Sequence, residues 1–333
     1  MQGYSGIAGH DDIKIELRET VSSGRIGHAY IFEGEDASGR AGLAKAFAAS
    51  LLCEAGGPEA CGDCPSCRRS LSGNSPDLTE VAPDPDKKNA GIGVEEIRRR
   101  IVDDASVRPF FGGRKVYLVL EAQKMTAQAQ NALLKTLEEP PANVVIILVC
   151  DDADHLLETV RSRCRVISCG ALAEATIKKT LLRNGMADEH TAGLCAALSG
   201  GDLQAAEAYA SSEVFLHISY EAMAALKDLS GLSMRRMHDM LDMVKDASAA
   251  DLMLRIMKIW FRDVLLFKAT AEVNSISFSG ELRSIRRCAA RNDYLDLEKA
   301  LHDVDKARVR LDANVNQELT MELLLLSLRE TIK

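Results

Sequence analysis

Apolar residues follow two different periods along the chain, and the pattern changes near residue 170. Before that point, apolar runs of strand length alternate with segments of helical period. The sequence predicts helices at residues 11–24, 39–55, 94–107 and 126–139, and strands at residues 28–32, 78–81, 115–122, 143–150 and 164–169. Strands that are apolar throughout and separated by helices are typical of a parallel sheet with helices on both faces. We therefore expect an α/β domain at residues 1–169.

After residue 170 the strand patterns stop and only helical periods remain. Residues 171–209 contain three short helical segments, which are interrupted at Asn184-Gly185 and at Gly200-Gly201. Residues 213–333 contain apolar stripes that predict four or five longer helices, with a turn at residues 271–281. The sequence therefore predicts two all-helical domains after the α/β domain, at residues 170–210 and 211–333.

The composition narrows the classes of function. A formal net charge of −8 argues against a polycation that coats nucleic acid. The first residues lack the charged-then-apolar pattern of a signal peptide, and the longest apolar runs are too short to cross a bilayer. We therefore expect a cytoplasmic protein without a membrane partner.

Four of the nine cysteines are grouped at Cys53, Cys61, Cys64 and Cys67. The segment C-G-D-C-P-S-C contains two overlapping C-x-x-C turns, and four thiolates satisfy tetrahedral Zn²⁺ without leaving a position for a substrate. We expect a structural zinc site that closes residues 53–67 into a knuckle. An iron–sulfur cluster fits the spacing too, and unrelated reduced cysteines are the remaining alternative. The other five cysteines lie in apolar surroundings and are expected in the core.

Residues 28–47 resemble a phosphate-binding loop that lacks its reactive side chains. Gly34 and Gly39 have the separation found in G-x-x-x-x-G-K-[ST], and they lie between an expected strand and an expected helix. Arg40 takes the place of the lysine and Ala41 takes the place of the hydroxyl that holds Mg²⁺. An arginine is a poor substitute for a point donor, and alanine cannot bind a metal. We expect ATP or ADP to bind weakly or not at all, and no hydrolysis.

A second element of an ATPase is missing further along the chain. An ATPase of this class carries acidic residues at the end of a later strand, where this chain has Leu120-Glu121. Arg163, in the segment S-R-C-R, precedes another expected strand. An arginine in such a loop can complete the phosphate site of a neighbouring subunit. From the residue alone, a surface salt bridge is the favoured interpretation, and only the accompanying motifs change it.

Several segments in the same order resemble the delta-prime family of bacterial DNA polymerase III clamp-loader subunits. These are GRIGHAYIFEG, the degenerate loop, the four cysteines, NALLKTLEEPP at residues 131–141, and SRC at residues 162–164. The resemblance covers residues 1 to about 210. It implies an AAA+ module at residues 1–169 that contains the zinc knuckle, a helical lid at 170–210, and a collar domain at 211–333.

The resemblance also implies a function. A delta-prime subunit is a non-catalytic, comparatively rigid member of a five-membered hetero-oligomeric ring, with tau/gamma and delta subunits as partners. The ring opens the sliding clamp and places it on primed DNA. Arg163 would reach into the ATP site of the adjacent tau/gamma subunit. The polymerase activity belongs to the complex, and no intrinsic ATPase is expected of this chain.

Two alternatives remain. A tau/gamma-type ATPase of the same fold would have lysine and threonine at Arg40 and Ala41, and an Asp-Glu pair at Leu120-Glu121. It would also carry an arginine at Gln204 and often a polar sensor at Cys150, so each of these positions favours delta-prime. The other alternative is a zinc-dependent nucleic-acid-binding module, against which the acidic net charge and the helical remainder argue.

Overall fold

The computed structural model describes residues 3–35, 39–84, 91–111, 113–244, 246–273 and 275–333. The chain divides into two compact units, which meet in sequence between Leu172 and Ala173. The first unit contains all the strands among the described residues, and the second is helical. This change of secondary structure agrees with the change of hydrophobic period near residue 170.

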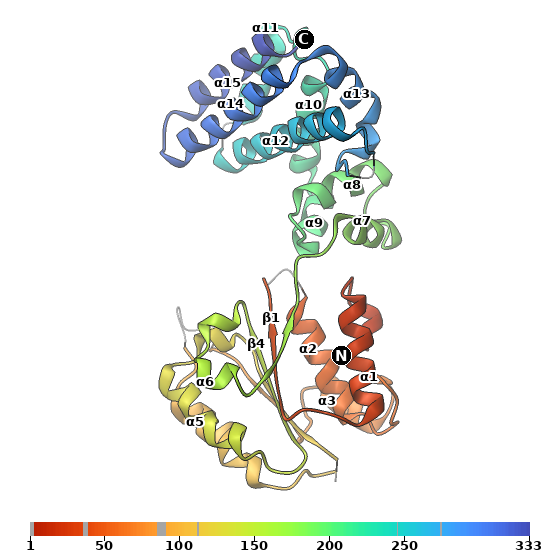
Figure 1. The fold of residues 1–333 in the computed structure, drawn as a ribbon, viewed down its shortest axis with the longest axis vertical. Coiled ribbons are helices and arrows are strands. Elements are labelled where there is room, and N and C mark those ends of the chain that lie inside the picture. Colours follow the sequence, from red (N-terminus) through yellow and green to blue (C-terminus); the bar gives the residue numbers. More distant parts are fainter. Residues whose placement is uncertain (1–2, 36–38, 85–90, 112, 245, 274) are drawn as a thin grey trace. The chain divides into compact units, whose positions relative to one another are not determined.

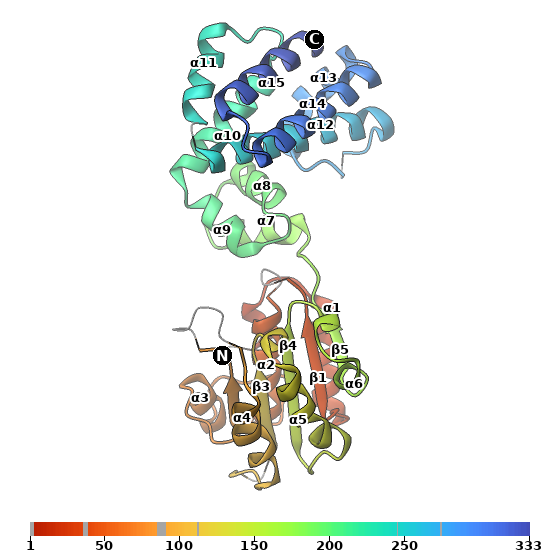
Figure 2. The same cartoon turned by 90° about the vertical axis from the view of Figure 1, so that its left-hand side faces the viewer.

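The first unit is built on a five-stranded parallel sheet, as the sequence predicts. The strands lie in the order β2-β3-β4-β1-β5, and each adjacent pair is parallel (Figure 2). They are β1 (Ala29–Glu33), β2 (Leu78–Val81), β3 (Lys115–Val119), β4 (Val144–Cys150) and β5 (Arg165–Ser168). Because β1 pairs with β4 and β5, its last residue Glu33 is level with Cys150 and Ser168 at one edge of the sheet.

Helices cover both faces of this sheet (Figure 1). Side chains alternate along β1, so Tyr30 and Phe32 enter one core and Ala29 and Ile31 enter the other. The first core is covered by α1 (Asp11–Ser23) and α2 (Arg40–Leu52), and the second by α5 (Ala127–Glu138) and α6 (Glu158–Arg161). Burial of both faces explains why the strands are apolar throughout.

The remaining elements of the first unit are short. They are η1 (Tyr4–Gly6), α3 (Pro65–Leu71), α4 (Val94–Ile97), the π-helical η3 (Arg98–Val102), η4 (Asp104–Ser106), η5 (Ala122–Lys124) and η6 (Ala153–His155). The sequence predicts one helix at residues 94–107, whereas the structure changes from α to π to 3₁₀ geometry within it. Ile97 and Ile101 nevertheless stay buried on the same side, so the apolar pattern is satisfied.

The second unit begins with three short helices, as predicted. They are α7 (Glu174–Arg183), α8 (Glu189–Leu198) and α9 (Leu203–Ala210). Gly185, Gly200 and Gly201 interrupt them with positive φ angles, which glycine adopts without steric cost. The expected breaks are therefore confirmed.

Six α-helices follow among the described residues, so the prediction of four or five was wrong. They are α10 (Glu213–Leu226), α11 (Met234–Met243), α12 (Ala247–Thr270), α13 (Leu282–Arg291), α14 (Tyr294–Asp312) and α15 (Gln317–Thr331), with η7 (Ser279–Glu281) before α13. Only Asn292 and Asp293 separate α13 from α14, where Asp293 caps α14 in a capping box with Asp296. So short an interruption barely disturbs the apolar period.

The long helix α12 lies at the centre of the second unit. It packs against α10, α13 and α14 (Figure 2). Its Trp260 is fully buried. No described helix has the length and apolar content needed to cross a membrane. The division of this unit into a lid at 170–210 and a collar at 211–333 stays a prediction.

Candidate functional site

The segment after β1 forms the strand-to-helix turn that the sequence predicts. Gly34 follows the strand with a φ angle of 144°, and Gly39, with a φ angle of 76°, caps the start of α2. Residues 36–38, at the centre of the loop, lie outside the described residues. Both glycines have positive φ angles that residues with a Cβ rarely adopt, which explains why glycine occupies these positions.

Arg40 is turned into the protein. Its residue is only 3% exposed, and its Nη1 donates a hydrogen bond to the carbonyl oxygen of Gly34. One of its guanidinium donors is therefore used by the same loop that would have to surround a phosphate. Ala41 is exposed and offers no ligand atom for Mg²⁺.

A carboxylate that sequence reasoning missed stands at the base of this loop. Glu33 Oε1 accepts a hydrogen bond from Ser168 Oγ at 2.5 Å, and its Oε2 accepts one from the Ala153 backbone N–H at 3.1 Å. Glu33 thus joins the ends of β1 and β5 to the segment after β4. Its negative charge opposes a phosphate at this edge of the sheet. The only sequence signal was an acidic residue directly before Gly34.

The residues at the expected magnesium-binding position are engaged within the protein. Leu120 packs against the core of the α1–α2 face, and Glu121 pairs with Lys124 at an Oε2–Nζ distance of 2.5 Å. Cys150, at the position where a tau/gamma-type ATPase often has a polar sensor, is fully buried. Burial, with the Glu33 carboxylate nearby, raises the pKa of Cys150 to about 12, so its thiol stays protonated and uncharged.

Arg163 lies in the turn between α6 and β5 and joins two of the sequence motifs. Its Nη2 is 2.8 Å from Glu138 Oε1, and its Nη1 donates to the Thr159 carbonyl at 2.8 Å. Glu138 is the last residue of α5, where a negative charge is unfavourable against the helix dipole and a cation nearby offsets it. The side chain of Arg163 is 35% exposed, so its guanidinium is held on the surface.

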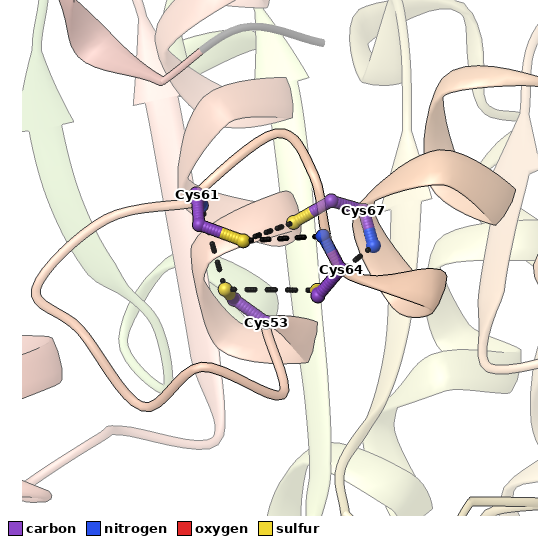
Figure 3. A group of neighbouring side chains, drawn as sticks. All are labelled: Cys53, Cys61, Cys64 and Cys67. Atoms are coloured by element: carbon purple, nitrogen blue, oxygen red, sulfur yellow. Dashed lines mark hydrogen bonds between the residues drawn. The ribbon is translucent and has the colours of Figure 1, made fainter.

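The four grouped cysteines converge at the end of α2 (Figure 3). Their sulfurs all lie within 4.8 Å of one another, with Sγ–Sγ distances of 4.0 Å for Cys53–Cys64 and for Cys61–Cys67. Tetrahedral zinc with Zn–S bonds of about 2.3 Å places its sulfurs about 3.8 Å apart. The donor set and its spacing could therefore hold one metal ion.

Backbone N–H groups point at three of these sulfurs. The N–H of Cys61 contacts the Cys53 sulfur at 3.4 Å, that of Cys64 the Cys61 sulfur at 3.3 Å, and that of Cys67 the Cys64 sulfur at 3.4 Å. Such contacts stabilise thiolates, which are the form that binds a metal.

The sulfurs also affect one another's ionisation. Burial opposes the ionisation of Cys64, but hydrogen bonds from the Cys67 and Glu54 backbone N–H groups and from neighbouring thiols lower its pKa to about 6. Burial, and then the neighbouring Cys64 and Cys53 sulfurs, raise the pKa of Cys67 to about 12. Four thiolates this close would repel one another, and a bound cation would offset that repulsion.

The other five cysteines are packed in the two units, as predicted. Cys150, Cys169, Cys195 and Cys288 are buried and Cys164 packs against the α5–α6 core. Burial raises the pKa values of all five, to about 12 for Cys150, Cys164 and Cys169 and about 11 for Cys195 and Cys288. Buried neutral thiols of this kind are inert packing groups.

Sequence comparison places both units in one family. The family model described as "DNA polymerase III, delta subunit" matches residues 9–172, and the model described as "DNA polymerase III, delta subunit, C terminal" matches residues 223–330. The DNA polymerase III subunit delta' of Bacillus subtilis (strain 168) is 28% identical over 322 residues, which are 94% of this chain and 94% of that one.

Two further relatives match parts of the chain. The subunit delta' of Yersinia pestis is 38% identical over 43% of this chain and 42% of its own length. The DNA polymerase III subunit tau of Salmonella typhimurium is 34% identical over 57% of this chain, but only 29% of its own length is covered. Of these three, the B. subtilis subunit delta' is matched over nearly its whole length. The chain belongs to the delta-prime family of DNA polymerase III clamp-loader subunits.

Proposed function

We propose that this clamp-loader subunit hydrolyses no ATP itself and donates Arg163 to the ATP site of a neighbouring subunit. The observation that carries the proposal is the state of the loop after β1. Arg40 is buried and bonded to the Gly34 carbonyl, and Ala41 has no hydroxyl. A loop in this state lacks the ammonium and the magnesium ligand that phosphoryl transfer requires.

Arg163 is suited to act on a neighbour because its present ion pair is weak. Exposed pairs of this kind contribute about 0–1 kcal/mol. An arginine supplied to a transferring phosphoryl group is worth about 10³–10⁵ in rate, or roughly 4–7 kcal/mol. Loss of the contact with the Glu138 carboxylate would therefore cost little free energy. The new contact with a phosphate would lower the activation barrier by much more.

The proposed partners are tau/gamma and delta subunits in a hetero-oligomeric ring, with the sliding clamp and primed DNA as the objects of the assembled complex. In this arrangement residues 1–169 form the AAA+ module, 170–210 the lid and 211–333 the collar. The relatives named as delta' and tau support this composition of the complex.

We further propose that the metal of the knuckle (residues 53–67) is a structural Zn²⁺. Four sulfur ligands complete its tetrahedral coordination, so no position remains for a substrate or a reactive water. The ion would neutralise the grouped thiolates of Cys53, Cys61, Cys64 and Cys67 and close the loop that joins α2 to α3.

The test is ATP turnover in a complex reconstituted with tau/gamma, delta, clamp and primed DNA. We expect Arg163→Ala to lower turnover at the adjoining site by on the order of 10³-fold, while the complex still assembles on a sizing column. Arg161→Ala is the matched control, because Arg161 is an arginine of the same segment that pairs with Asp154. Equal turnover of these two variants would reject the role of Arg163.

A second variant separates a catalytic role from a structural one. Glu138→Ala removes the same ion pair but leaves the arginine in place. We expect this variant to retain full turnover, since it frees the guanidinium. If Glu138→Ala lost turnover as severely as Arg163→Ala, the pair would be a structural contact.

The tau/gamma-type alternative has its own assay. Hydrolysis of Mg·ATP by the purified chain, abolished by Arg40→Ala, would identify an unconventional ATPase and overturn the proposal. We expect no turnover above background.

A further inference from the structure

An exposed aromatic segment lies beside the knuckle. Residues 107–111, here called the aromatic tip, directly follow η4. Val107, Phe110 and Phe111 are exposed, and Phe110 is 76% exposed. Large apolar side chains grouped on a surface are uncommon and would move freely unless other residues held them.

The backbone of the tip is fixed by a buried carboxylate. Asp77, which is 4% exposed, accepts hydrogen bonds from the Phe110 N–H at 2.7 Å and from the Phe111 N–H at 3.1 Å. The two rings contact each other edge to face, with centroids 5.0 Å apart. The conformation of the tip is thus defined although its rings face solvent.

The rings are held by an arginine from the knuckle's own helix. The guanidinium carbon of Arg69 lies 3.8 Å from the centroid of the Phe111 ring, the close stacking typical of a cation–π contact. Its Nη2 pairs with Glu54 Oε1 at 2.8 Å. Glu54 directly follows Cys53, and Arg69 comes two residues after Cys67. This pair therefore joins both ends of the knuckle.

The helix that carries Arg69 depends on the cysteines. α3 is only seven residues long, too short to be stable by itself. Cys64 caps its N-terminus, and Cys67 lies in its first turn (Figure 3). A metal bound by these two sulfurs would fix the start of α3, and with it the direction of Arg69.

We propose that the knuckle holds the aromatic tip in place, with Arg69 as the positioning residue between the metal site and the Phe111 ring. This inference rests on the proposed zinc site. It gives that site a task beyond local folding: the shape of an exposed apolar surface depends on the metal.

The test uses the full chain and measures hydrogen exchange at the Phe110 and Phe111 amides, together with the rate of chymotrypsin cleavage after Phe110. Metal content is determined on the same samples. In Arg69→Ala we expect both rates to rise by about two- to fivefold, as for the loss of an exposed cation–π contact, with the metal retained. In Cys64→Ser we expect loss of the metal and a rise of about tenfold or more, because the whole of α3 loosens.

Two controls make the result specific. Arg68→Ala alters the neighbouring exposed arginine of α3, for which no contact with the tip is found among the described residues, and should match wild type. Arg69→Lys keeps a cation over the ring and toward Glu54, so it should lie nearer to wild type than Arg69→Ala.

The outcomes separate the inference from the zinc proposal. Equal exchange in Arg69→Ala and Arg68→Ala would overturn the role of Arg69. Loss of metal in Cys64→Ser with an unchanged tip would overturn the coupling and leave the zinc proposal intact. Wild-type protein without metal would overturn the zinc proposal and the metal dependence together, whereas the Arg69 variants would still report on the contact itself.

Discussion

A candidate site lies at each end of helix α2. The two sites differ in whether other groups of the protein bond their polar side chains. At the N-terminus, Gly39 caps the helix and Arg40 stands where a phosphate-binding loop would have its lysine. At the C-terminus, Cys53 caps the helix and contributes the first of four converging sulfurs. A backbone turn of the kind that places a ligand can thus be present without the side chains that bind the ligand.

The difference is clearest in the polar groups. At the loop, two charged side chains bond within the protein: Arg40 to Gly34, and Glu33 to Ser168 and Ala153. At the knuckle, the four sulfurs lie within 4.8 Å of one another, and as thiolates they would repel one another without a bound cation. We expect the first site to be stable without a ligand and the second to require a cation. The following variants test this contrast.

Removal of a ligand from the knuckle should have the largest effect on stability. We expect Cys64→Ser to lose the metal and to destabilise the first unit by on the order of 5 kcal/mol. This is less than the roughly 10–16 kcal/mol that zinc contributes in isolated finger peptides, because the sheet has its own core. Metal analysis should find about one zinc per wild-type chain.

The control for this prediction is Cys164→Ser, which changes a cysteine outside the cluster. It should keep the full metal content. Stoichiometric iron in the wild-type protein would instead indicate an iron–sulfur site and contradict the assignment of zinc.

Arg40→Ala should have the next largest effect. We expect it to change only the free energy of unfolding. It removes a buried guanidinium that bonds the Gly34 carbonyl, which should cost about 1–3 kcal/mol in urea unfolding. Lys45→Ala, on the same helix, removes a half-exposed pair with Glu80 and should cost less than about 1 kcal/mol. A variant at Arg40 with unchanged stability and impaired nucleotide binding would show that the loop still serves a ligand.

The hydrophobic pattern was enough to predict the sheet and its flanking helices, and the cysteine spacing was enough to predict that four cysteines group together. Each of these follows from local period or spacing, which a chain displays without its tertiary contacts. The role of Glu33 and the pair between Glu138 and Arg163 could not be predicted from local sequence. Glu33, for example, bonds to residues that lie 120 and 135 positions away in the sequence. Only the folded arrangement of the strands brings such partners together.

The separation of α13 from α14 shows why the number of helices in the second unit is hard to predict from the sequence. Asn292 and Asp293 separate α13 from α14, but the apolar residues on either side continue with nearly the same period. The break depends on the side chain of Asp293, which caps the next helix. An aspartate cap within a continuous apolar stripe is a weak sequence signal, because aspartate also occurs on exposed helix faces.

The smallest predicted effect is a pH dependence at the loop end of the sheet. Asp151 accepts the Gly34 N–H through its carbonyl, and its carboxylate is 2.9 Å from His155 Nδ1. This hydrogen bond raises the pKa of His155 above 6.5, so the stability it contributes is fully present below pH 6.5 and is lost as the pH rises through the folded value. A histidine NMR titration should show the raised pKa, and Asp151→Asn should return it toward 6.5. If His155 titrated alike in both proteins, the charges at this edge would not be engaged within the chain, and the contrast with the knuckle would weaken.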